Sequence, residues 1–238
     1  MSQLSNEIFL QDFGKIWLVV PQTLFLSVIL LLLGLVGGAF LAQGQLSHHA
    51  WLRGWSRSYV TYFRGIPLVI HLFIVYYGLP VLLTAILPPL FGISPVKLQR
   101  LNPLYAIIIA YTLYTAAFMS EIIRGAYQSV DQEQLDAAQA LGYTRWQTYR
   151  LVKLPQALTE ALPKLLNYYL LLIRQLSLAF LVSFVDIFAQ AQLQSAINYR
   201  YIESYCAAAL IYWLIGIGLT LLFNWGERRL KRYQVNHN

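Results

Sequence analysis

The sequence contains five long apolar stretches in which charged residues are nearly absent, and this pattern limits the fold more than any single motif. A helix needs about 20 apolar residues to cross the hydrocarbon core of a bilayer. We therefore expect an all-α integral membrane protein, a single transmembrane domain over 1–238, with five transmembrane helices near 17–43, 66–87, 103–123, 165–189 and 205–225. The first stretch exceeds the apolar core of a signal peptide, about 7–15 residues, so it is predicted to be a retained helix.

The composition agrees with this fold class and excludes several others. Hydrophobic residues make up 58% of the chain and charged residues 11%, whereas soluble domains carry about 25% charged residues. The net charge of +7 does not indicate nucleic-acid binding, because the basic residues are scattered and not clustered on one polar face. Phosphate-loop, zinc-protease and hydrolase-nucleophile motifs do not occur in the sequence. We expect no enzymatic activity, metal site or cofactor on this chain.

The distribution of basic residues predicts the topology. Twelve of them fall in the segment after the last stretch and in the loops 44–65 and 124–164, and only four fall in the opposite loops. Lysine and arginine are enriched on the cytoplasmic side of membrane proteins. The N-terminus is therefore predicted outside and the C-terminus in the cytoplasm.

The segment 124–164 is long for a simple connection and carries signals for two short helices. Ser129 to Gln132 can form a capping box, with Asp131 as a competing N-cap. Gly142 stands where a glycine ends a helix in the left-handed region. Thr144 to Gln147 is a second capping box, and Pro155 is expected to limit the helix that it starts. The small residues Ala137 and Ala138 either contact a partner or pack on the protein's own inner helix ends.

This segment resembles the "EAA…G…LP" loop of ABC-importer permeases, and it does so through Asp136-Ala137-Ala138, Gly142 and Leu154-Pro155. Two further matches are typical of the polar-amino-acid branch of that family: Arg64-Gly65-Ile66-Pro67-Leu68 and Glu121-Ile122-Ile123-Arg124-Gly125. The resemblance covers about residues 17–232. It implies the type I importer permease fold, in the cytoplasmic membrane of a bacterium.

The resemblance also implies what the subunit does and what it binds. The loop 131–155 would insert into a dimer of ABC ATPases, which bind ATP and magnesium on a separate chain. A second permease copy, identical or different, would complete the path, and an extracytoplasmic amino-acid-binding protein would deliver a polar amino acid. The residues expected to contact the ATPase are Asp136, Ala137, Ala138, Gly142, Leu154 and Pro155.

The sequence departs from the family pattern at points that concern the cargo. Ile66 replaces the usual threonine, and Asp136 replaces glutamate. The fourth stretch reads Arg174-Gln175-Leu176-Ser177-Leu178 where the family commonly reads Lys-Asp-Thr-Ser-Leu. Gln175 offers a neutral amide in place of a carboxylate, which argues against a strictly cationic cargo. It favours neutral, polar or acidic amino acids, including cystine-like ones.

Several polar residues of the apolar stretches are candidates for the transport path, because a charge inside the bilayer is costly unless it is paired or faces water. Arg174 either lines the path or pairs with Asp186 or Glu121. His71 is either a hydrogen-bonded packing residue or a cargo contact. The path residues expected from motif and position are Arg64, Pro67, His71, Arg174, Gln175, Ser177 and Asp186.

Glu121 and Arg124 are three residues apart, so they share one helix face. They are predicted to form a structural pair or to brace a gate. Gly34 and Gly38 form a G-x-x-x-G pattern, which favours close helix packing. A secondary transporter or channel, driven by an ion gradient through Glu121, Arg174 and Asp186, is the alternative function.

Overall fold

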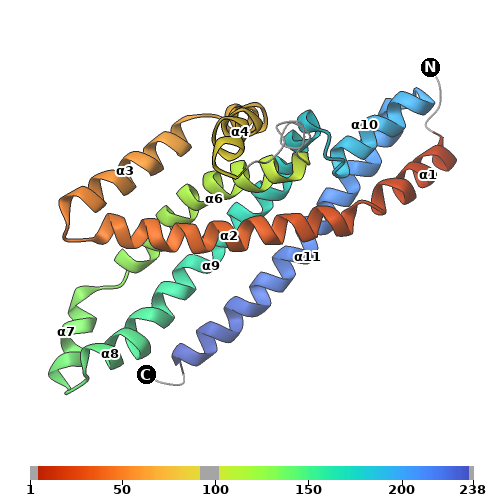
Figure 1. The fold of residues 1–238 in the computed structure, drawn as a ribbon. Helices are drawn as coiled ribbons and strands as arrows, with labels where there is room; N and C mark the ends of the chain where they lie inside the picture. Colours follow the sequence, from red (N-terminus) through yellow and green to blue (C-terminus); the bar gives the residue numbers. More distant parts are fainter. Residues whose placement is uncertain (1–4, 92–101, 236–238) are drawn as a thin grey trace.

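The computed structural model describes residues 5–91 and 102–235, and it is built from helices joined by short connections (Figure 1). In chain order these are α1 (Asn6–Trp17), α2 (Val20–Leu46), α3 (Ala50–Gly65), α4 (Leu68–Phe91), α6 (Pro103–Gln128), α7 (Gln132–Ala140), α8 (Arg145–Gln147), the π-helix η1 (Thr148–Lys153), α9 (Leu154–Gln175), the 3₁₀-helix η2 (Leu176–Val182), α10 (Ile187–Asn198) and α11 (Tyr201–Val235). Within the described residues, five helical segments are long and apolar enough to cross a membrane. The predicted all-α, five-span fold is confirmed.

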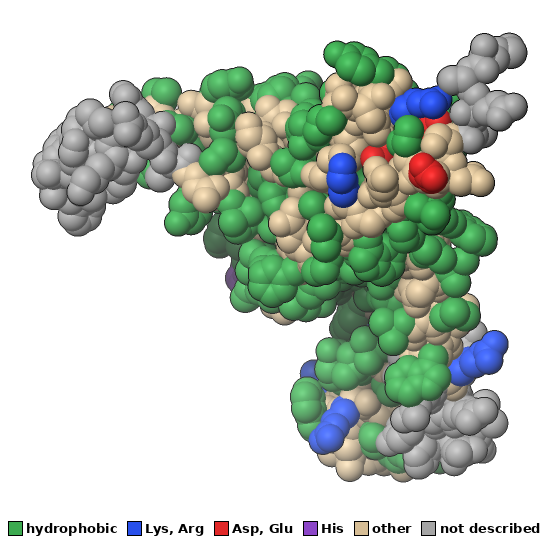
Figure 2. Space-filling view, turned by 90° about the vertical axis from the view of Figure 1, so that its right-hand side faces the viewer, with side chains coloured by type: hydrophobic (Ala, Val, Ile, Leu, Met, Phe, Trp, Pro, Cys, Tyr) green, Lys and Arg blue, Asp and Glu red, His purple; other side chains and the backbone are tan. Residues whose placement is uncertain are grey.

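The elements divide between the two ends of the helix bundle (Figure 1). α7, α8 and the last turns of α11 lie at one end, and α1 and α10 lie at the other. Seen from the side, hydrophobic side chains cover the middle of the molecule, and charged side chains lie towards its ends (Figure 2). This is the distribution that a bilayer requires, while the side that each end faces stays a prediction.

The most extensive helix contact joins α2 to α6, and glycines make it possible. A Cβ atom added at Gly34 would overlap Thr115, and one at Gly38 would overlap Met119. Small residues let two helix backbones approach closely. Such close packing stabilises helix pairs in a membrane, because lipid tails are as apolar as the side chains and supply no hydrophobic driving force. The packing role predicted for the G-x-x-x-G pattern is confirmed.

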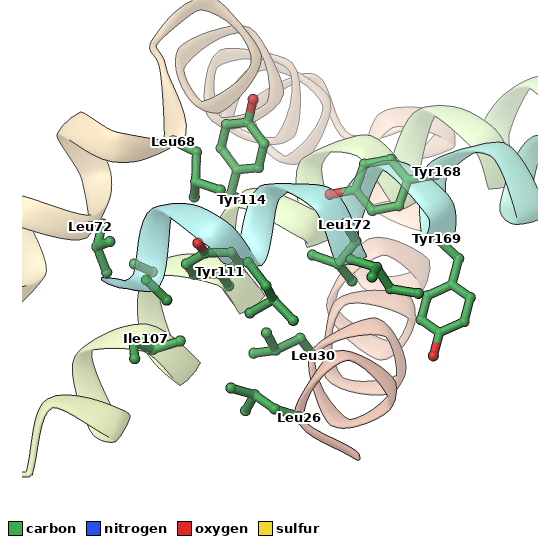
Figure 3. Close-up of a cluster of buried hydrophobic side chains, with 14 of the residues drawn as sticks. Leu26, Leu30, Leu68, Leu72, Ile107, Tyr111, Tyr114, Tyr168, Tyr169 and Leu172 are labelled. Carbon is green, nitrogen blue, oxygen red and sulfur yellow. The ribbon is translucent and has the colours of Figure 1, made fainter. Parts of the chain in front are cut away.

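The main core lies where α2, α4, α6, α9 and η2 meet, with side chains from these helices pointing at one another (Figure 3). Tyr111 is fully buried, and its hydroxyl donates a hydrogen bond of 2.7 Å to the carbonyl of Gln175. Since that carbonyl lies where α9 gives way to η2, the bond satisfies a group that a broken helix would leave unpaired.

A second, smaller core joins α1 to α10 and α11. Asp12 of α1 is buried, and its carboxylate accepts hydrogen bonds from the Asn198 amide at 2.9 Å and from the Ser204 hydroxyl at 2.5 Å. A buried carboxylate is tolerated only when donors compensate for its lost hydration. These bonds fix α1 against the opposite end of the chain.

One predicted span is not the continuous helix expected. The span predicted at 165–189 ends as an α-helix at Gln175 and continues as 3₁₀ turns to Val182. Ser183 then takes a left-handed conformation with φ 69°, and Asp186 caps α10. The first predicted span is continuous in α2 from Val20, with Pro21 in the first turn and α1 before it as a separate helix.

Candidate functional site

The segment between α6 and α9 has the helix–glycine–helix form that its sequence predicts, with two differences. Asp131, not Ser129, caps α7 by accepting from the Glu133 amide at 3.1 Å. Gly142 has φ +90°, as a helix-ending glycine should. The capping box of Thr144 and Gln147 is present. The helix that it starts does not stop at Pro155, which occupies the first turn of α9 and is compatible with helix there.

α7 buries one face and exposes the other, and this separates the two small residues. Leu135 and Ala138 are buried, whereas Asp136 and Ala137 are exposed. The buried face packs on η1, whose first residue, Thr148, is buried as well. Of the two interpretations left open for the alanine pair, Ala138 therefore fits packing on the protein itself, and Ala137 fits a contact with a partner.

The segment that carries α7 is held to both neighbouring spans. The Gln156 amide at the start of α9 donates a 2.8 Å hydrogen bond to Gln134 of α7. The Lys153 ammonium lies 3.5 Å from the centre of the Tyr127 ring, near the end of α6. Because α9 begins at Leu154, directly after this lysine, the contact joins the start of α9 to the end of α6.

The tip beyond α7 exposes large apolar side chains. Leu141 is 81% exposed and Trp146 65% exposed. Trp146 also stacks on Tyr149, with ring centres 5.7 Å apart. Large exposed apolar groups of this kind mark a contact surface for another protein or for the membrane.

Two of the predicted path residues meet around Tyr114. The His71 ring stacks on Phe63 at 4.6 Å and lies 5.9 Å from the Tyr114 ring. The Gln175 side chain lies beside the Tyr114 hydroxyl. Within the described residues, both ring nitrogens of His71 and the Oε1 atom of Gln175 are buried without a hydrogen-bond partner. The Pro67 backbone also acts on the His71 ring, so the packing and cargo-contact alternatives for His71 both stay predictions.

Arg174 is next to Gln175 at the end of α9, and Ser177 lies in the first turn of η2. The Arg174 side chain is exposed and lines a groove of about 470 Å³ between α9 and α11. Its Nε donates to the Leu170 carbonyl at 3.1 Å, and the Ser177 hydroxyl donates to the Arg174 carbonyl at 2.8 Å. Neither Glu121 nor Asp186 forms an ion pair with Arg174 in the part of the chain that the structure describes.

Asp186 is fully buried. One carboxylate oxygen accepts from the Ala189 amide at 2.9 Å, as the N-cap of α10, and the other accepts from the Tyr212 hydroxyl at 3.0 Å. Both oxygens are therefore committed to holding α10 on α11.

Glu121 and Arg124 are joined at 2.7 Å, and Arg64 approaches the same carboxylate at 3.5 Å. Arg64 precedes the corner between α3 and α4, where Pro67 is exposed. These charged side chains line a cleft of about 660 Å³ together with Arg57.

Tyr114 and Arg57 were not among the candidates from sequence. The i, i+4, i+11 spacing of Arg53, Arg57 and Arg64 on one helix was the signal for a basic face.

The chain is similar to known transport proteins over nearly its whole length. The family model described as "Binding-protein-dependent transport system inner membrane component" matches residues 34–232. The probable amino-acid permease protein YxeN of Bacillus subtilis is 32% identical over 232 residues, 98% of each chain. The probable amino-acid ABC transporter permease protein PatM of Vibrio harveyi is 39% identical over 180 residues, 76% of this chain and 75% of that one.

A solved structure shares the fold. It is described as the crystal structure of an amino acid ABC transporter with histidines, and it has a TM-score of 0.78 and 26% sequence identity. The match covers 96% of this chain and 100% of that one.

Proposed function

The chain belongs to the family of binding-protein-dependent transport system inner membrane components, and we propose that it is the permease subunit of an ABC importer that carries a polar amino acid. Its similarity to two probable amino-acid permeases, over 98% and 76% of the chain, supports this cargo class. The observation that carries the proposal is the two-sided α7, with Ala138 packed inward and Ala137 facing out.

In the proposed mechanism, α7 and the apolar tip dock on an ATPase subunit that binds ATP and magnesium on a separate chain. Asp136, Ala137 and Leu141 are exposed for this contact. Gly142 shapes the turn that presents the tip, and Leu154-Pro155 begins the span that receives the motion. When ATP closes the ATPase dimer, the displacement of α7 enters the membrane through the contacts of its loop with α6 and α9.

The cargo path is proposed to pass His71 and Gln175, with Arg174 at the end of α9 and Ser177 in the first turn of η2. The unpartnered polar atoms of His71 and Gln175 can hydrogen-bond a polar cargo, and Arg174 can meet its carboxylate. Pro67 sets the corner from which α4 presents His71. We leave Asp186 and Arg64 out of the path, because Asp186 is a buried cap and Arg64 contacts Glu121.

Further partners follow from the surface of the subunit. Of the helices long enough to span a membrane, α4 is the least buried. Only 11% of the most apolar stretch within its residues Leu68–Ile86 is covered by the rest of the protein. Its exposed residues include Ile74, Tyr77 and Val81. We propose that a second permease copy covers this helix in the bacterial cytoplasmic membrane, and that a binding protein delivers the amino acid from outside.

The test is reconstitution of the chain in lipid with the ATPase encoded beside it. ATP hydrolysis and uptake should rise when an amino-acid-loaded binding protein is added, and no uptake should occur with an ATPase variant that cannot hydrolyse ATP. Uptake that persists with this ATPase variant and collapses with the ion gradient would instead establish the secondary transporter.

A further inference from the structure

The polar cleft between α2, α3 and α6 has chemistry that the proposed cargo path does not use. Neither His71 nor Gln175 lines it. Its charged and amide side chains come from the end of α2, the inner face of α3 and the last turns of α6: Gln45, Arg57, Arg64, Glu121, Arg124 and Gln128.

The cleft carries more positive than negative charge. Three guanidinium groups line it against the single carboxylate of Glu121. Glu121 contacts Arg124 at 2.7 Å and Arg64 at 3.5 Å, and Arg124 also donates to Gln128 at 2.8 Å. Across residues 5–91 and 102–235, Arg57 has no ion pair or side-chain hydrogen bond. Such a surplus favours an anion, and the planar guanidinium suits two oxygens of one phosphate group.

α3 indicates the source of that anion. Its basic residues Arg53, Arg57 and Arg64 follow the spacing i, i+4, i+11, and its aromatic residues Trp51, Trp55 and Tyr62 follow the same spacing two positions earlier. At 100° per residue, the two sets lie on different sides of the helix. Trp51 is 72% exposed and Trp55 60% exposed.

Tryptophan and tyrosine gather at the level of lipid headgroups, and basic amphipathic helices bind the anionic lipids found there. α3 therefore has the side chains of a helix at the membrane surface, and the cleft lies directly beneath its basic side.

We propose that this cleft binds the phosphate of an anionic phospholipid headgroup, with Arg57 as the free guanidinium that receives it. Arg64 and Arg124 add positive charge while Glu121 holds them in place. The exposed Trp51 and Trp55 keep α3 at headgroup depth. A lipid bound at this site would bridge α2, α3 and α6. This lipid-binding role is separate from the part that these helices play in cargo transport.

The test counts lipids bound to the purified full chain by native mass spectrometry, during titration with phosphatidylglycerol or with phosphatidylcholine of the same acyl chains. We expect tighter binding of phosphatidylglycerol. Arg57→Gln should weaken that binding about fivefold, because it removes the guanidinium that meets the phosphate inside the cleft, a contact of about 1 kcal/mol. Binding of phosphatidylcholine should not change.

Arg53→Gln is the matched control, because Arg53 has the same charge on the same helix but donates to the Ser47 carbonyl and does not line the cleft. It should bind phosphatidylglycerol as the unmodified chain does. Equal losses for Arg53→Gln and Arg57→Gln, or equal binding of the two lipids, would overturn the proposal. So would displacement of the lipid by millimolar inorganic phosphate or glutamate, which would assign the cleft to a soluble anion.

Discussion

The ammonium group of Lys153 lies 3.5 Å from the centre of the Tyr127 ring, and this contact joins the turn before α9 to the end of α6. The two residues are far apart in the sequence, and α7 lies between them. A cation over an aromatic face is worth about 0.5–1 kcal/mol at an exposed site. The contact closes the loop that carries α7, so that this loop is held on both sides.

Replacing Tyr127 with leucine should weaken this closure without unfolding the protein, because the tyrosine is partly exposed. We expect uptake to fall about two- to fivefold, in line with the loss of a contact of that strength. Tyr127→Phe keeps the ring face and should transport normally. The measurement is uptake per ATP hydrolysed in proteoliposomes, and equal values for both variants would contradict a coupling role for the contact.

Gly142→Ala should reduce uptake by distorting the turn after α7. A side chain in the left-handed region costs about 1–2 kcal/mol, and Gly142 has φ +90° with open space around its α-carbon, so the cost is conformational and not steric. Gly142→Pro should abolish uptake. Gly54→Ala on α3, where nothing would contact the added methyl group, is the control. Membrane levels measured by immunoblot should be the same for all three variants.

The two alanines of α7 should respond differently to a large charge. Ala137→Arg adds its side chain to the exposed face and should prevent co-purification with the ATPase, while thermal stability stays unchanged. Ala138→Arg forces a charge into the contact with η1 and should lower the unfolding temperature, because burying an unpaired charge is strongly unfavourable. Normal ATPase binding by Ala137→Arg would contradict the docking face proposed for α7.

His71→Phe should separate stability from transport. Both ring nitrogens of His71 are buried without a partner within the described residues, so an apolar ring of similar shape should leave thermal stability equal or higher. Uptake should nevertheless fall at least tenfold if the histidine contacts the cargo. His71→Gln, which restores a hydrogen-bonding group, should recover part of it. Unchanged uptake by His71→Phe would remove His71 from the path.

The spans could be predicted from the sequence because apolar length is a local property that the bilayer selects directly. The helix end at Gly142 and the capping box of Thr144 could also be predicted from the sequence, since each depends on residues within one turn. The left-handed turn at Ser183 could not be predicted, because a serine gives no strong local signal for that conformation. The hydrogen bond of Tyr111 that satisfies the Gln175 carbonyl at the end of α9 likewise depends on another helix, α6.

In the candidate site too, local features could be predicted from the sequence, and contacts between distant segments could not. Motif resemblance identified the segment that carries α7, but the inward turn of Ala138 depends on where η1 packs. The sequence placed Asp186 among the path residues, because it is a charge inside an apolar stretch. In the structure its carboxylate is hydrogen-bonded by a backbone amide and by the hydroxyl of Tyr212, 26 residues further along. Arg57 became a candidate only when α2, α3 and α6 were seen to enclose a cleft.

The hydrogen bonds of Asp12 have a consequence for biosynthesis. Its donors, Asn198 and Ser204, lie more than 180 residues downstream. A ribosome releases the chain in order, so α1 emerges long before any group that can hold it. Until Ser204 has been synthesised and its helix inserted, the Asp12 carboxylate has to remain in contact with water. Docking of α1 is thus a late event, and its protection from protease during translation would report that the last span has reached its place.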